Sequence, residues 1–280
     1  MSDAVFIPAQ ASAAGLADQA AGPAVERFVA TDLARGPWDP GAQHGGAPAA
    51  LLVRALERQP GGEELILARV TYELLRPVPL GALEVRAEVV RPGRRVQLLE
   101  ATLRTDDGVE VMRARALKVQ RSEAAASDDC GGSAPSAAAG PESGRGVEFP
   151  SHGNRMFATH AMDIRFLSGT FLEPGPATAW FRLRHPLVDG EEPTSLQRLA
   201  AAADFGNGIS AVLPWDRYVF INPDLTVYLE RAPVGEWFLL ESETRLGRGG
   251  VGLSESLIYD EIGRVGRASQ ALIVAARAAT

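Results

Sequence analysis

The sequence has few of the residues that build disulfide frameworks and zinc sites. It holds one cysteine, Cys130, and four histidines. A single cysteine cannot form an intramolecular disulfide, and the histidines lack the spacing of zinc ligands. We therefore expect neither a disulfide framework nor a structural metal, and we predict no cofactor.

Positive charge and long apolar runs are also scarce. The chain has 28 Lys and Arg against 35 Asp and Glu, a formal net charge of -7, which argues against nucleic acid or an anionic membrane as partner. Its apolar stretches are shorter than the roughly 20 residues that span a bilayer. The start lacks a basic segment followed by an apolar one. We expect a cytoplasmic protein.

The composition is otherwise that of a folded globular chain. Hydrophobic residues make up 46% and charged residues 22% of 280 residues, enough for a sizeable core. Residues 120–153 differ, because they are rich in Ala, Ser, Gly and Asp and almost empty of large apolar side chains. We predict domains at 1–119 and 154–280, joined by a flexible linker at 120–153 that adds nothing to the core.

The two halves resemble each other. An offset of 155 residues aligns 65–119 with 220–274 without a gap, and 12 of the 55 pairs are identical, including Thr71 with Thr226 and Gly108 with Gly263. Chance at ordinary composition gives about four identities. The hypothesis is a duplicated chain.

Period-two alternation predicts strands in both halves. Residues 83–89 and 99–103 alternate apolar and polar side chains. Residues 106–108 and 260–263 predict hairpin turns in which glycine supplies a positive φ. Each half should therefore end in a long antiparallel hairpin.

Two segments are apolar on nearly every side and predict fully buried helices. They are residues 47–56 and 199–203, and Thr194 with Gln197 has capping-box spacing before the second. A small-residue helix enclosed by a curved antiparallel sheet is the hot-dog arrangement. The predicted fold class is α+β, a double hot dog with two tandem copies of a buried central helix wrapped by a curved sheet.

The repeat breaks at three positions where a carboxylate or an amide stands only in the second half. At the offset of 155, Ala49 faces Asp204, Leu67 faces Asn222 and Arg115 faces Gln270. A buried carboxylate needs polar partners or a raised pKa. Each residue also has an ordinary structural interpretation: a helix-ending Asp, an Asn-Pro turn and an edge-strand Gln. Together they predict one site, in the second half.

Several segments carry a family pattern. They are HGGAPAALLVRAL (44–56), LLRPVPLG (74–81), Asp204, DLTVYLER (224–231) and SQALIVAAR (269–277). On these residues the chain resembles the acyl-CoA thioesterase II (TesB-like) family. The resemblance implies a double hot dog that hydrolyses acyl-CoA to free acid and CoA, with the water held by Asp204, Asn222 and Gln270. The best-known members carry Thr at the position of Asn222.

The implied mechanism needs a positioned water, a base and an oxyanion donor. No G-x-S-x-G elbow is present, so a serine nucleophile is not expected. Asp204 is the expected base, and a backbone amide or the Gln270 amide is the expected oxyanion donor. Expected substrate contacts are His44, Gly45, Gly46, Phe205, Gly206, Trp215, Phe220 and Arg248. Candidates for the CoA phosphates are Arg91, Arg94, Arg95, Arg245 and Arg248.

Two other functions remain open at this point. A hot-dog hydratase or dehydratase would use a His with an acid, and His44 stands at a helix entrance, although the first half offers no comparable buried acid. A non-catalytic protein would bind acyl thioesters without turnover. The chain is expected to be a monomer or a homodimer.

Overall fold

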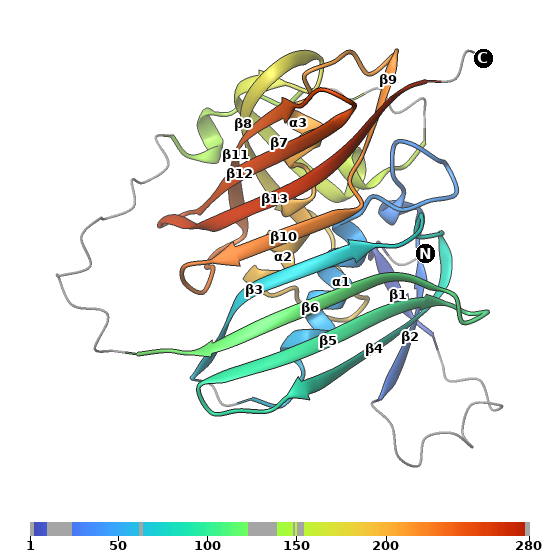
Figure 1. Ribbon diagram of the computed structural model, residues 1–280, viewed down its shortest axis with the longest axis vertical. Helices are drawn as coiled ribbons and strands as arrows, with labels where there is room; N and C mark the ends of the chain where they lie inside the picture. Colours follow the sequence, from blue (N-terminus) through green and yellow to red (C-terminus); the bar gives the residue numbers. More distant parts are fainter. Residues whose placement is uncertain are drawn as a thin grey trace.

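One large antiparallel sheet, with helices packed on one of its faces, forms the body of the computed structural model (Figure 1). The structure describes residues 3–9, 24–61, 64–122, 139–147, 149 and 154–277. The strands of the first half are β1 (Phe6–Pro8), β2 (Val25–Ala30), β3 (Leu65–Leu74), β4 (Gly81–Arg91), β5 (Val96–Thr105) and β6 (Glu110–Gln120). Those of the second half are β7 (Met162–Thr170), β8 (Glu173–Leu183), β9 (Tyr218–Ile221), β10 (Asp224–Leu229), β11 (Trp237–Leu246), β12 (Val251–Asp260) and β13 (Gly263–Ala276).

The strand order is symmetric about the pairing of β3 with β10. It runs β1-β2-β4-β5-β6-β3-β10-β13-β12-β11-β8-β7, with β9 pairing beside β13. At the centre Thr71 lies opposite Thr226, and Thr226 Oγ1 donates to Thr71 Oγ1 at 3.2 Å. Hydrogen bonds between β3 and β10 therefore join the halves into one continuous sheet.

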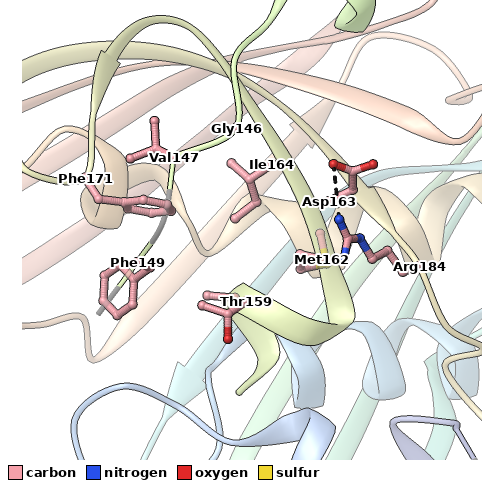
Figure 2. A pocket seen from close by; sticks show the side chains of 10 residues that line it. Gly146, Val147, Phe149, Thr159, Met162, Asp163, Ile164, Phe171 and Arg184 are labelled. Carbon is pink, nitrogen blue, oxygen red and sulfur yellow. Dashed lines mark ion pairs between the residues drawn. The ribbon is translucent and has the colours of Figure 1, made fainter. Parts of the chain in front are cut away.

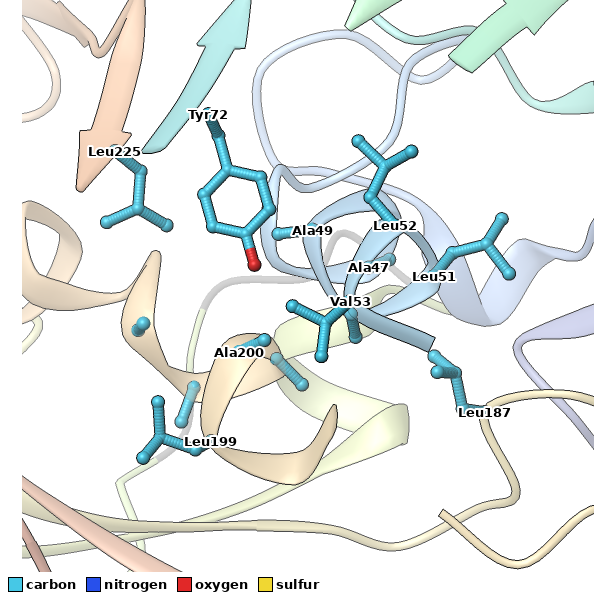
Figure 3. Packing of buried hydrophobic residues seen from close by; sticks show 14 of the residues in the cluster. Ala47, Ala49, Leu51, Leu52, Val53, Tyr72, Leu187, Leu199, Ala200 and Leu225 are labelled. Carbon is cyan, nitrogen blue, oxygen red and sulfur yellow. The ribbon is translucent and has the colours of Figure 1, made fainter. Parts of the chain in front are cut away.

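Two helices fill the concave side of the sheet. Helix α1 (Gly46–Glu57) packs against β4, β5 and β6, and α2 (Ser195–Ala203) packs against β8 and β11. The helices also pack on each other, and a Cβ on Gly46 would clash with the Ala201 carbonyl oxygen. Figure 3 shows Tyr72 of β3 directed toward both helices.

The local predictions for these elements are confirmed. Every residue from Gly46 to Leu56 is buried. Thr194 caps α2 by accepting from Gln197 N at 3.1 Å. The turn glycines Gly108 and Gly263 have φ of 84° and 136°. The glycines stand where an L side chain would be strained, as the hairpin prediction required.

The prediction of a gapless repeat is wrong in the last strand of each half. Five residues separate the paired Arg104 and Glu110, but four separate Tyr259 and Arg264. The residue opposite Thr71 is Arg115, whereas the residue opposite Thr226 is Ser269. The first-half counterpart of Gln270 is therefore buried Ala116 and not Arg115, whose side chain is 65% exposed.

The offset of 155 residues also fails to align equivalent positions of the two helices. Ala49 lies near the start of α1, whereas Asp204 is the C-cap of α2. The comparable acid is Glu57, the last residue of α1, which accepts from Thr194 Oγ1 at 3.0 Å and Gln197 Nε2 at 2.8 Å at the start of α2. Asp204, at the end of α2, likewise lies against the start of α1, where it contacts His44. The prediction that the acid stands only in the second half is wrong.

Part of the predicted linker packs on the second half. Val147 and Phe149 contact the hydrophobic core, and Trp180 Nε1 donates to the Ala139 carbonyl at 2.9 Å. The expectation that residues 120–153 add nothing to the core is wrong for these side chains, because the segment's few large apolar residues lie at its end. Cys130 falls outside the described residues. Among the described helices, none is long and apolar enough to cross a membrane.

Candidate active site

Three strands and a helix end bring the predicted polar residues together around Asp204. Its side chain is 7% exposed. Asp204 Oδ1 accepts from Asn222 Nδ2 at 2.8 Å and from Gln270 Nε2 at 3.0 Å. Asn222 lies between β9 and β10, and Gln270 points inward from β13. The interpretation of Gln270 as an edge-strand residue that reaches solvent is wrong, because its buried side chain binds the carboxylate, and Asn222 binds the carboxylate as well.

The two amides are committed to holding the carboxylate. Asn222 Nδ2 also lies 3.2 Å from the Asp224 carbonyl, and Gln270 Nε2 lies 3.3 Å from the Asp204 carbonyl. Gln270 Oε1 accepts from Asn207 N at 3.2 Å. Each amide nitrogen carries two hydrogens, so both hydrogens of Gln270 face oxygens of Asp204. The Gln270 amide is therefore a poor candidate for the oxyanion donor.

The other oxygen of Asp204 faces the start of α1. His44 Nδ1 lies 3.2 Å from Asp204 Oδ2 and also accepts from Gly46 N at 3.1 Å. The imidazole packs against the rings of Phe205 and Phe157, with centroids 4.2 and 5.3 Å away. Sequence reasoning missed this His–Asp pair because it sought the acid for His44 within the first half, whereas the helix crossing supplies it from the second.

Burial controls the protonation of this pair. It raises the pKa of Asp204, opposed by His44 and by hydrogen bonds from Asn222, Gly46 and Gln270. It lowers the pKa of His44, opposed by Asp204. These shifts favour a neutral imidazole at His44. They also mean that the Asp204 carboxyl group releases its proton at a higher pH than an ordinary Asp. The α1 N-terminus offers partial positive charge that favours the carboxylate.

Gly45 lies so close to the carboxylate that the position has no room for a side chain. A Cβ at this position would lie 2.7 Å from Asp204 Oδ2. Gly45 is only partly buried, and its N–H donates to no described residue. An unpaired backbone N–H at a helix N-terminus is a suitable donor for a developing oxyanion.

Family comparisons cover both halves of the chain. The model of the acyl-CoA thioesterase N-terminal domain matches residues 34–119, and that of the C-terminal domain matches residues 134–274. The chain belongs to the acyl-CoA thioesterase family. The resemblance stated from the sequence is thereby confirmed, and Asp204, Asn222 and Gln270 all lie within the C-terminal match of this thioesterase-family protein.

Solved structures show the same fold. A conserved protein of unknown function with hot dog fold from Alicyclobacillus acidocaldarius has a TM-score of 0.70 and 17% identity, over 91% of this chain and 94% of that chain. An acyl-CoA thioesterase II, TesB2, from Mycobacterium marinum has a TM-score of 0.65 and 18% identity, over 91% and 94%. Among curated proteins none matches the sequence. The hot-dog prediction is confirmed at the level of the fold.

The other residues of the thioesterase-family chain that were predicted to contact substrate lie in different places. Phe205 and Gly206 are buried beside the site, where a Cβ on Gly206 would lie 3.2 Å from Gln270 Oε1. Phe220 is buried under Trp215, with ring centroids 5.3 Å apart. Arg248 lies in the β11–β12 turn, whose Gly250 carbonyl accepts from Val274 N at 3.0 Å.

The two arginine hairpins lie at opposite ends of the sheet. Leu74 N donates to the carbonyl of Pro223, next to Asn222, so the site lies at the C-terminal end of β3. Gln120 N donates to the Arg95 carbonyl, and Gln120 pairs with Leu65 at the other end of β3. The length of β3 is about 30 Å. Arg91, Arg94 and Arg95 are therefore too far from Asp204 to share its ligand.

A cavity of about 600 Å³ lies apart from Asp204 (Figure 2). It is lined by Gly146, Val147, Phe149, Ala158, Thr159, Met162, Asp163, Ile164, Phe171 and Arg184. The π-helical turn η5 (Phe157–Ala161) separates the two places, because Phe157 packs on His44 while Ala158 and Thr159 face the cavity. The cavity contains none of the predicted site residues. Among the described residues, no cluster of His, Cys, Asp and Glu side chains could hold a metal.

Proposed function

We propose that this protein hydrolyses acyl-CoA thioesters, using a water activated by Asp204 and held by Asn222 and Gln270. Membership of the acyl-CoA thioesterase family supports the reaction class. The observation that carries the site assignment is the buried Asp204 carboxylate with two amide donors on one oxygen and a helix N-terminus beside the other. The chain is proposed to be two tandem hot-dog units with this one active site.

The proposed reaction begins with attack by water. The water oxygen forms a bond to the thioester carbonyl carbon as Asp204 takes a proton, and the carbonyl oxygen becomes an oxyanion. The Gly45 N–H stabilises that oxyanion, and Asn222 Oδ1 accepts the second hydrogen of the water. The carbon–sulfur bond then breaks, and Asp204 returns its proton to the thiolate. The products are a carboxylic acid and CoA.

The raised pKa of Asp204 suits this role. A carboxylate in water is too weak a base to deprotonate water efficiently, and burial strengthens it. The amide donors oppose the effect of burial and favour the ionised form. Asn222 binds both the carboxylate and the water, whereas Gln270 acts on the water through the carboxylate that it holds.

The test is thiol release from acyl-CoA esters of graded chain length by wild type and Asp204→Asn. We expect the substitution to lower kcat at least about a hundredfold, because general-base catalysis is removed. Glu57→Gln is the matched control, because it alters the comparable acid at the end of α1 without touching the site. Retained turnover in Asp204→Asn with intact folding would refute the assignment.

The His44–Asp204 pair favours a second candidate, an enoyl-thioester hydratase or dehydratase. The structure pairs His44 with Asp204 from the second half. Such an enzyme changes the enoyl absorbance without releasing thiol, whereas a thioesterase releases thiol. Incubation with crotonyl-CoA distinguishes them. Binding without either change would indicate a non-catalytic acyl-thioester-binding protein.

A further inference from the structure

We propose that Trp38, Trp215 and Arg277 form a stacking platform for the adenine nucleotide end of the CoA substrate. This inference rests on the proposed function. The three residues are called the Trp38 platform below. It lies outside the catalytic group and draws on both halves of the chain.

The platform is an exposed aromatic and cationic surface. Trp38 is 43% exposed, and its ring centroid lies 4.9 Å from that of Trp215. The Arg277 guanidinium carbon lies 5.5 Å from the Trp38 ring centroid. Arg277 Nε donates to the Trp215 carbonyl at 2.8 Å, and Trp215 Nε1 donates to the Phe171 carbonyl at 3.0 Å. The Trp38 ring is thus contacted by the Trp215 ring and by the Arg277 guanidinium, which lies over it.

An exposed indole beside a guanidinium group matches the chemistry of a purine base. Bases stack on tryptophan rings and on arginine planes, and the cation adds electrostatic attraction. Trp38 lies in the loop before α1, and 43% of it is exposed. The formal net charge of -7 disfavours a nucleic-acid polymer as the source of the base.

The platform lies at the same end of the sheet as Asp204. A hydrogen bond from Gly36 N to the Ala42 carbonyl closes the base of the loop that carries Trp38. His44 follows this loop in the chain. On the other side Trp215 packs on Phe220, which precedes Asn222 in β9 and its following turn. Both tryptophan segments therefore lead directly into residues that contact Asp204.

The separation of platform and carboxylate suits the substrate. Gln270 and Arg277 lie on one continuous stretch of β13 and its exit, which spans about 23 Å. The pantetheine arm of CoA separates the thioester from the nucleotide by a comparable extended length. The acyl thioester can thus reach Asp204 while the base lies on Trp38.

Arginines without ion pairs to any described residue lie on the platform and on the segments hydrogen-bonded to its strand. Arg277 N donates to the Arg217 carbonyl, and the β11–β12 turn that carries Arg248 bonds to Val274. Within the described part of the chain, Arg217, Arg248 and Arg277 form no ion pair, whereas Arg245 pairs with Glu243 and Glu255. Free arginines near an exposed aromatic ring are suited to the phosphates of the nucleotide.

The experiment compares one acyl group carried on CoA and on pantetheine, which lacks the nucleotide. In Trp38→Ala and Arg277→Gln we expect KM for the acyl-CoA to rise about tenfold, with kcat and the KM for acyl-pantetheine unchanged. Trp38→Phe should retain most of the affinity. Arg94→Gln, an exposed arginine at the far end of the sheet, is the matched control and should change neither substrate.

A binding measurement separates this inference from the proposed function. Adenosine 3′,5′-bisphosphate should quench the tryptophan fluorescence of wild type, and the quenching should be lost in Trp38→Ala, which removes the stacking surface and leaves Trp215 as a reporter. Equal rises in KM for both thioesters, or no quenching of wild type at millimolar nucleotide, would overturn the platform. Failure to hydrolyse either thioester would refute the proposed function, and the fluorescence titration would still decide whether the platform binds the nucleotide.

Discussion

Thr71 and Thr226 face each other at the centre of the sheet, and each is the counterpart of the other in the repeat. Their hydroxyl oxygens are 3.2 Å apart across the antiparallel pairing of β3 with β10. Two equivalent residues can meet in this way only on an approximate two-fold axis. The axis therefore passes between these threonines and relates the two halves of the sheet.

A disulfide should form at this axis. In a Cys130→Ser background, Thr71→Cys with Thr226→Cys brings two thiols close enough to bond on oxidation. We expect loss of both free thiols in a thiol titration, reversed by reductant. Thr71→Cys with Tyr228→Cys is the control, because Tyr228 pairs with Arg69 and the diagonal distance is too long. Equal oxidation of both pairs would contradict the register.

Asp204 should make stability fall as pH rises. Burial raises the pKa of Asp204, so the folded protein holds this proton to higher pH than the unfolded chain. The free energy of unfolding therefore decreases between the unfolded pKa of about 4 and the higher folded pKa. In Asp204→Asn this loss is absent. The Tm of the variant relative to wild type should increase with pH over that interval, and a constant difference would contradict the shift.

Gly45 and Gly46 should respond differently to an added methyl group. In Gly45→Ala the Cβ would approach Asp204 Oδ2, so we expect kcat to fall more than tenfold at little cost in Tm, since φ of -59° suits alanine. In Gly46→Ala the Cβ meets the backbone of α2, so we expect a loss of about 1–3 kcal/mol in unfolding free energy. Thermal melts and kcat for both variants are the measurements, and matching effects in the two would be inconsistent with the structure.

Asn222 should tolerate threonine but not valine. A threonine hydroxyl can still donate to Asp204 Oδ1, whereas isosteric valine cannot. We expect Asn222→Thr to stay within about tenfold of wild-type kcat, and Asn222→Val to fall about ten- to a hundredfold because a bond to a charged group is lost. If valine were as active as threonine, Asn222 would have no role in holding the carboxylate.

The sequence pattern predicted the strands and helices because each of them depends on residues that are close together in the sequence. Alternation at 83–89 lies within β4, and the all-round apolar run at 47–56 lies within α1. Helix burial, the Thr194 cap and the turn glycines depend on residues a few positions apart. The amide ligands Asn222 and Gln270 were also identified, through the family pattern and through the absence of an amide at the aligned positions of the first half.

Only the tertiary structure decided which residues are equivalent and which meet. One residue fewer in the β12–β13 turn changes the counterpart of Gln270 from Arg115 to Ala116, because side chains alternate between the two faces of a strand. The crossing of α1 and α2 places His44 and Gly45 from the first half against Asp204 from the second. The amino-acid sequence determines the strands, the helices and the chemistry available. The packing of the helices on one shared sheet determines which of those groups come within bonding distance, since such contacts join residues that no local period relates.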